Sequence, residues 1–203
     1  MGKSPVTGIV MATHLEAAPF IDSGTFTPLE KKPLPVYRSG SCYLIISGVG
    51  KSCSAIAATY LIIKYNTEIM YNIGAAGSTT DSYSPGDIIH IDSVIEYDRP
   101  PMRGTWERHT RPDVLPGFTT GTLATQDRAV VSAREREEVG KLASLVDMEG
   151  AAFVQACRMF RVKNYLFKMV TDTPSHTDND EIVENIRRLR DILYGFFMDN
   201  FLF

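Results

Sequence analysis

Short apolar runs alternate with amphipathic segments along most of this chain, and this alternation limits the possible fold more than any other feature. Apolar runs bounded by glycine, proline or polar residues predict buried strands, and apolar residues three and four positions apart predict helices. The predicted strands cover residues 8–12, 36–38, 42–47, 68–73, 87–94, 119–125, 145–148 and 165–171. The predicted helices cover residues 14–21, 52–65, 133–141, 149–160 and 179–200, and the charged helix 133–141 is expected to be exposed. Such a succession favours an α/β sandwich whose central sheet is largely parallel or mixed.

The composition is that of an ordinary globular protein. The 203 residues are expected to form one domain, 1–203, with 44% apolar and 22% charged residues. A net charge of −3 argues against nucleic acid as a partner. No run approaches the roughly 18 apolar residues of a membrane span, so no membrane contact is expected. Three separated cysteines and four scattered histidines predict neither a disulfide framework nor a metal site, and this cysteine usage favours a reducing cytoplasm.

Two glycine-containing segments follow predicted strands and invite comparison with phosphate-binding loops. Residues 48–52 read GVGKS, but the triphosphate motif needs glycine at the position of Ile45, and the dinucleotide motif needs glycine at the position of Cys53. A tight turn is therefore the favoured interpretation, and no nucleotide cofactor is expected. Residues 74–78 read GAAGS and are predicted to be a loop whose small side chains let a ligand approach the backbone.

Three carboxylates stand at the ends of predicted strands: Glu16, Glu149 and Asp172. Taken singly, each has an ordinary interpretation, as a solvated charge on a helix, an acid at a helix N-terminus and a turn residue, respectively. Taken together they are more informative, because polar groups at the strand ends of an α/β sheet commonly share one ligand cleft. We therefore expect these three side chains to line a common cavity.

Residues 98–117 are rich in proline and arginine and surround Trp106. A long loop of this kind is expected to be functional or mobile. Arginines beside an aromatic ring could contact nucleic acid, but the acidic net charge favours a solvated loop or one that is ordered at an oligomer interface.

The order of several short motifs resembles one known family. ATHLEA, SGVGK, NIGAAGS, PGDIIHID, ATQD, VDMEGAAF and MVTD follow one another within about residues 7–175. The series resembles the nucleoside phosphorylase superfamily, and within it is most similar to the methylthioadenosine/S-adenosylhomocysteine nucleosidases and the futalosine hydrolases. The resemblance implies a three-layer α/β/α sandwich with a central mixed sheet and no metal or cofactor. It also implies a homodimer in which the 98–117 loop helps to complete the neighbouring site.

The resemblance further implies roles for individual residues. Glu16 matches the acid that activates the attacking water, and Asp172 matches the acid that protonates the purine at N7 and receives its 6-amino group. Met148 and Glu149 match the pair that holds the ribose hydroxyls. The remaining positions that match substrate-binding residues, near the ribose and the base, are Ala76, Gly77 and Val130.

Three positions depart from the family pattern. Ala75 stands where the nucleosidases have serine, Ala129 where they have the phenylalanine that stacks on the purine, and Lys168 where they have arginine. These changes leave the three acids in place but leave the identity of the substrate open.

The expected activity is hydrolysis of the N-glycosidic bond of a 5′-modified adenosine of the methylthioadenosine/S-adenosylhomocysteine type. Three alternatives stay open: a futalosine or 6-amino-futalosine hydrolase of menaquinone biosynthesis, a phosphate-dependent phosphorylase, and a non-catalytic nucleoside-binding relative. Phosphorylases of the superfamily present several arginines to phosphate, whereas Arg38 is the only arginine before residue 99 here. The expected partner is a small nucleoside.

Overall fold

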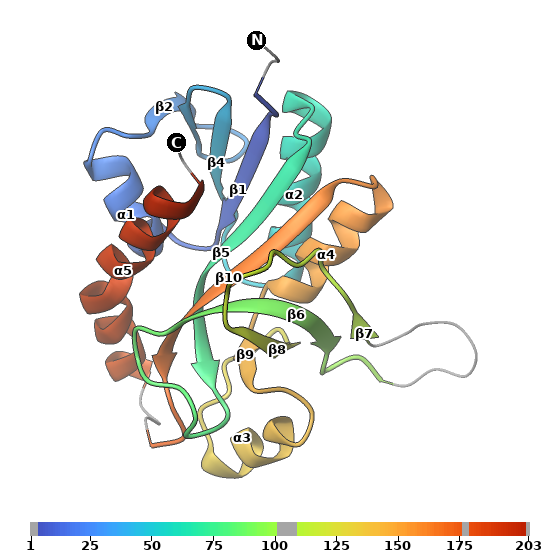
Figure 1. Ribbon diagram of the computed structural model, residues 1–203, viewed down its shortest axis with the longest axis vertical. Coiled ribbons are helices and arrows are strands. Elements are labelled where there is room, and N and C mark those ends of the chain that lie inside the picture. The colour runs from blue at the N-terminus through green and yellow to red at the C-terminus, as the bar shows by residue number, and fades with distance from the viewer. Residues whose placement is uncertain (1–3, 101–108, 176–178, 202–203) are drawn as a thin grey trace.

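The computed structural model describes residues 4–100, 109–175 and 179–201, and its elements alternate along the chain as predicted (Figure 1). The strands are β1 (Thr7–Met11), β2 (Thr27–Glu30), β3 (Val36–Ser39), β4 (Cys42–Ile46), β5 (Ile69–Ser78), β6 (Ile88–Glu96), β7 (His109–Thr110), β8 (Thr120–Thr125), β9 (Leu145–Asp147) and β10 (Lys163–Asp172). The helices are α1 (His14–Asp22), α2 (Lys51–Tyr65), α3 (Ala133–Gly140), α4 (Gly150–Met159) and α5 (Asn179–Phe201).

The strands form one mixed sheet, which confirms the predicted fold class. Strand β1 pairs in parallel with β4 and β5, and β5 pairs in parallel with β10. From β10 the pairing continues through β6, β8 and β9 and returns to β5, so these five strands close into a ring. At the other side, β3 and β2 continue the sheet in antiparallel fashion.

Helices cover both faces of the sheet and make three layers (Figure 1). Helices α1 and α5 pack together on one face, and α2 and α4 pack together on the other. Because side chains alternate along a strand, Leu166 of β10 joins the hydrophobic cluster under α2 and α4, while Phe167 joins the aromatic cluster under α1 and α5. Ala57 and Ala58 are completely buried, so their small side chains let α2 approach the sheet closely.

Residues 74–78 were expected to be a loop, and this prediction is wrong: they continue β5, in which residues 74–77 pair with β10 and residues 77–78 pair with β9. Glycine and alanine are poor strand formers, so their propensity pointed away from a strand. The tertiary structure explains their presence. A Cβ atom on Gly74 would lie 2.7 Å from Glu16 Oε1, and a Cβ atom on Gly77 would lie 2.6 Å from Asp172 Oδ2. This part of β5 consists of small residues because two carboxylates lie against it.

The described parts of the chain contain no helix that is long and apolar enough to cross a membrane.

The structure covers only part of the segment 98–117. Residues 101–108 lie outside the described residues, and Trp106 is among them. The described part of that segment includes β7, which pairs with β6.

Candidate active site

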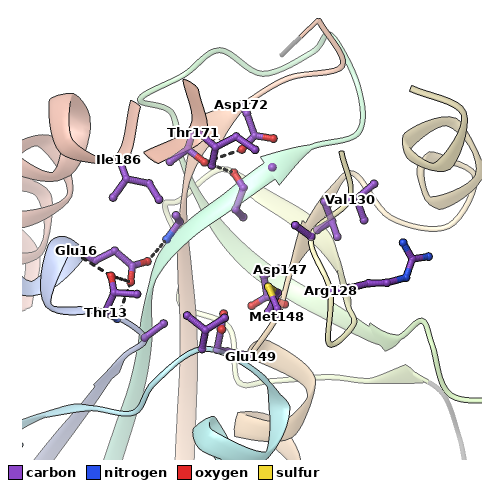
Figure 2. A pocket seen from close by; sticks show the side chains of 18 residues that line it. Thr13, Glu16, Arg128, Val130, Asp147, Met148, Glu149, Thr171, Asp172 and Ile186 are labelled. Atoms are coloured by element: carbon purple, nitrogen blue, oxygen red, sulfur yellow. Dashed lines mark hydrogen bonds between the residues drawn. The ribbon is translucent and has the colours of Figure 1, made fainter. Parts of the chain in front are cut away.

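A cavity of about 200 Å³ lies where the carboxyl ends of β1, β5 and β10 meet, the place where α/β sheets commonly bind ligands. Its walls also come from the start of α1, the loop 128–130, the junction of β9 with α4, and α5. Figure 2 shows Glu16, Glu149 and Asp172 on different sides of it. The residues predicted from the sequence to form the site all line this cavity: Glu16, Ala76, Gly77, Val130, Met148, Glu149 and Asp172.

Glu16 is a buried carboxylate held by the start of its own helix. The Thr13 hydroxyl accepts the Glu16 amide at 3.2 Å, and Glu16 Oε2 accepts the Thr13 amide at 2.9 Å and the Thr13 hydroxyl at 2.7 Å. This reciprocal arrangement is a capping box, a pattern that the T-x-x-E spacing signals and that sequence analysis overlooked. Glu16 Oε1 accepts the Ala75 amide at 2.8 Å. At 5% exposure, Glu16 is not the solvated charge that its helix position alone suggested.

Glu149 stands at the N-cap position of α4 and is also buried. Its Oε1 atom accepts the Gly50 amide at 2.9 Å. The glycine turn between β4 and α2 therefore binds a carboxylate of the protein itself. Burial, and secondly the negative charge of Asp147, raise the pKa of Glu149 to about 7, while Lys168 and the Gly50 amide act in the opposite direction.

Lys168 and Asp147 form a buried ion pair, with 2.8 Å between Nζ and Oδ2. Burial opposes the ammonium charge, but the carboxylates of Asp147 and Glu149 outweigh it, so the pKa of Lys168 is raised. Asp147 also accepts the Gly150 amide at 2.8 Å and the Thr125 hydroxyl at 2.5 Å. Lys168 therefore keeps a cation beneath the cavity although the family pattern has arginine there.

Asp172 ends β10 and is held from two directions. Its Oδ1 atom accepts the Thr171 hydroxyl at 2.8 Å, and its Oδ2 atom accepts Arg136 Nη2 in a short ion pair. Arg136 Nη1 donates to the Ser78 carbonyl at 2.8 Å. The helix 133–141 was predicted to be charged and exposed, and Arg136 corrects this prediction because its side chain is only 1% exposed. Nothing in the sequence pattern singles out Arg136 among its charged neighbours.

A family model described as the phosphorylase superfamily matches residues 7–116 and 107–197. The chain belongs to this superfamily.

Several relatives within the superfamily are similar over part of the chain. The 5′-methylthioadenosine/S-adenosylhomocysteine nucleosidase of Staphylococcus epidermidis is 27% identical over 150 residues, which cover 62% of this chain and 66% of the relative. The enzyme of the same name from Staphylococcus aureus strain RF122 matches with the same identity and coverage. The matched segment thus spans just under two thirds of the length of these relatives.

Solved structures share the fold over nearly the whole chain. A mutant of the Helicobacter pylori nucleosidase, solved with 5′-methylthioadenosine in its active site, has a TM-score of 0.86 at 17% identity and covers 98% of both chains. The futalosine hydrolase of the same organism has a TM-score of 0.83 at 18% identity and covers 94% of both chains. The Arabidopsis thaliana 5′-methylthioadenosine nucleosidase has a TM-score of 0.82 at 19% identity and covers 94% of this chain and 93% of that one.

The site of this superfamily member holds its three carboxylates in different environments. Glu16 is held by amides and a hydroxyl, Glu149 by one amide beside a buried ion pair, and Asp172 by a guanidinium. Different surroundings allow chemically identical groups to take different roles. The wall between them is largely apolar, as is common in small-molecule sites, and is lined by Val49, Ala75, Ala129, Ile182 and Ile186. Within the described residues, no group of three or more His, Cys, Asp or Glu side chains could hold a metal ion.

Proposed function

We propose that the protein is a purine nucleoside N-ribohydrolase that uses water to cleave a 5′-modified adenosine of the methylthioadenosine/S-adenosylhomocysteine type. The observation that carries the proposal is that Glu16, Glu149 and Asp172 line one cavity. The names of the matched relatives and the likeness of the fold to solved nucleosidases support it.

The proposed reaction breaks the bond between C1′ of the ribose and N9 of the purine. Asp172 delivers a proton to N7, so the base leaves as a neutral molecule. The sugar becomes oxocarbenium-like, and the carboxylate of Glu149 stabilises its positive charge while it binds the ribose hydroxyls together with Met148. Glu16 takes a proton from the water whose oxygen attacks C1′. The products are the free base and the free sugar.

The surroundings of each acid suit its proposed role. The Ala75 amide donates to Glu16 Oε1, and Thr13 donates to Glu16 Oε2. These hydrogen bonds fix the carboxylate in a position from which it is proposed to orient the attacking water molecule. Ala76 has a small side chain and Gly77 has none, so a nucleoside can lie close to the backbone of β5. Val130 is buried beside the cavity and is proposed to meet the purine edge through its backbone.

A direct test compares the wild type with Glu16→Gln and Asp172→Asn. We expect the wild type to release adenine from methylthioadenosine, and each variant to bind the substrate but to lose about 10²-fold or more in turnover. If the wild type binds nucleosides without releasing a base, the protein is a non-catalytic nucleoside-binding relative and the proposal is wrong.

Hydrolysis is favoured over phosphorolysis by the charges of the site. Among the described residues that line the cavity, Arg128 is the only basic one, and it is paired with Glu135. A phosphate co-substrate would need more cationic donors than this. Base release is expected to be the same with and without inorganic phosphate, and strict dependence on phosphate would overturn the hydrolase assignment.

A 6-amino-futalosine hydrolase is the second candidate, because the fold resembles the Helicobacter pylori futalosine hydrolase as well as it resembles nucleosidases. Such an activity would place the protein in menaquinone biosynthesis. The two candidates share the reaction and differ in the 5′ substituent. A panel of methylthioadenosine, S-adenosylhomocysteine and 6-amino-futalosine separates them by the ratio of their kcat/KM values.

We also propose a homodimer and a cytoplasmic location. Two isoleucines of α2 face outward, Ile56 at 62% and Ile63 at 63% exposure, and exposed apolar helix faces mark interaction surfaces. Light scattering on the wild type and on an Ile56→Glu/Ile63→Glu variant tests the dimer, since the variant is expected to be monomeric. The location rests on the cysteine usage of the sequence, and cell fractionation tests it.

A further inference from the structure

The turn GVGK, which resembles a phosphate-binding loop in its sequence, holds two carboxylates of the protein with successive amides. The Gly50 amide donates to Glu149 Oε1 at 2.9 Å, and the Lys51 amide donates to Asp127 Oδ1 at 2.8 Å. Glu149 belongs to the proposed active site. Asp127 directly precedes residues 128–130, which line the same cavity. The start of α2 is therefore bonded to two walls of the cavity, those that contain Glu149 and Val130 in Figure 2.

The side chain of Lys51 completes a closed network of contacts at this point. Lys51 Nζ lies 2.6 Å from Asp98 Oδ1, Asp98 Oδ2 accepts the Asp127 amide at 3.0 Å, and Asp127 Oδ1 accepts the Lys51 amide. Glu96 Oε1 lies 3.1 Å from the same ammonium group. We call the contacts among Lys51, Asp98 and Asp127 the Lys51 network. It joins the start of α2 to the segment after β6 and to the loop after β8.

The network is ionised although it is partly shielded from solvent. The side chain of Lys51 is only 16% exposed. Burial opposes its positive charge, but hydrogen bonds to Asp98 and Glu96 outweigh burial, so the pKa of Lys51 is raised. Burial also opposes the charges of these two carboxylates, yet hydrogen bonds, first among them those from Lys51, lower the pKa of each. Lys51 is therefore the cation that these carboxylates share.

Gly50 allows the turn to approach Asp127 this closely. Its φ of +105° lies in the left-handed region that favours glycine. A Cβ atom at this position would lie 3.2 Å from Asp127 Oδ1, so even an alanine would crowd the carboxylate. Contacts within the protein thus account for the second glycine of the GVGK motif.

The loop 127–130 is also held on its other side, independently of Lys51. The Gln126 amide donates to the Asp147 carbonyl at 3.1 Å, and Gln126 Nε2 donates to the Arg128 carbonyl at 3.0 Å. Loss of the Lys51 network is therefore expected to loosen the loop without unfolding the protein. Ion pairs that are partly open to solvent contribute little to stability, so the main consequence of the network is the place of the loop.

We propose that Lys51 is a positioning residue that holds the loop 127–130 against the start of α2 and thereby sets the purine-facing wall of the cavity. This inference rests on the proposed function, because it assumes that the base lies beside Val130. Lys51 is not among the described residues that line the cavity, so it acts through Asp98 and Asp127. A loop that is already in place does not have to be ordered when the nucleoside binds, so the network improves binding more than it assists bond breaking.

The test compares steady-state base release by the wild type, Lys51→Met, Lys51→Arg and Lys141→Met, with the best substrate of the nucleoside panel. We expect Lys51→Met to raise KM about tenfold and to change kcat less than about threefold, because binding is weakened while the three acids stay in place. Lys51→Arg keeps the cation and should recover most of the KM value. Lys141→Met removes the same charge from an exposed ion pair with Glu138 and should behave like the wild type.

A second variant breaks the same network from its other side. Asp98→Ala is expected to raise KM to a similar extent, and it replaces Lys51→Met where thermal melting shows that the latter does not fold. In Lys51→Met/Asp98→Ala the rise in KM should be much smaller than the product of the two single effects, because both changes break one network. Calorimetric titration with adenine checks that KM reports binding, since the dissociation constant should also rise about tenfold in Lys51→Met.

A purely structural role for Lys51 would reduce the amount of folded protein, which lowers the apparent kcat and leaves KM unchanged. That result, or a wild-type KM in Lys51→Met, would overturn the inference. If the wild type releases no base from any nucleoside of the panel, the proposed function itself is wrong. That outcome is seen in the wild type alone and is therefore distinct from a failure of the inference.

Discussion

The backbone amide of Gly50 donates a hydrogen bond of 2.9 Å to Glu149 Oε1, so the turn after β4 is joined to the start of α4 at the floor of the cavity. Glycine turns of this kind offer their amides to anions, commonly to phosphate. Here the anion is a side chain of the protein, and its carboxylate is held where the ribose is proposed to bind. The behaviour of Glu149 with pH is the first consequence that can be measured.

Base release is expected to fall as the pH drops below about 7. Burial, followed by the charge of Asp147, raises the pKa of Glu149 to about 7, and only the ionised form can stabilise a cationic sugar. The kcat/KM value for the substrate, measured across the acidic and neutral range, should show this acid limb. A profile that stays flat well below neutrality would contradict the assigned role of Glu149.

The stability of the fold is expected to decrease as the pH rises from about 4.5 to about 7 because of the same residue. The folded protein keeps a proton on Glu149 in this window, whereas the unfolded chain has already lost it, so raising the pH favours unfolding. Each pKa unit corresponds to about 1.4 kcal/mol, which makes the expected loss about 3 kcal/mol. Urea unfolding of Glu149→Gln should lack this contribution, and a variant that follows the wild type at every pH would refute it.

Replacing Lys168 by methionine is expected to destabilise the protein by about 3–5 kcal/mol, because Asp147 would remain buried without its counter-charge. Lys168→Arg keeps the cation and should lose much less. The control is Lys141→Met, which breaks an exposed ion pair with Glu138 and should leave the stability nearly unchanged. Chemical unfolding of the three variants gives the comparison, and equal stabilities for Lys168→Met and Lys141→Met would count against the buried pair.

Replacing Gly74 by alanine is expected to lower turnover by about 10²-fold, because the new Cβ atom would lie 2.7 Å from Glu16 Oε1 and displace the carboxylate. The matched control is Gly195→Ala in α5, where nothing lies within 4 Å of the added atom. That variant should keep its activity and gain up to about 1 kcal/mol in stability from helix propensity. Normal turnover in Gly74→Ala would mean that the position of Glu16 is not critical.

Much of the fold was predictable because its signals are local. The apolar run at residues 165–171 indicated the last core strand, and the spacing of apolar residues over 179–200 indicated the C-terminal helix. The order of the motifs indicated which acids to examine, and the structure places Glu16 and Asp172 at one cavity. Their roles, the single domain and the dimer stay predictions.

Other features were not predictable, because they depend on which segments meet. The GAAGS segment was predicted to be a loop because its residues are small and are poor strand formers. Its pairing with β10 makes it part of a strand instead. Arg136 was placed in solvent because its helix is highly charged, and only the packing of α3 against the ends of β5 and β10 turns that one arginine inward.

The sequence by itself determined the succession of strands and helices and the identity of the acids, since periodicity and short motifs can be recognised from residues that are close together in the sequence. Only the tertiary structure decided which partner holds each acid: Ala75 and Thr13 for Glu16, Gly50 for Glu149 and Arg136 for Asp172. The physical reason is that a buried charge is stabilised by whichever donors the packed chain brings within hydrogen-bond distance, and these donors come from segments that are remote in the sequence.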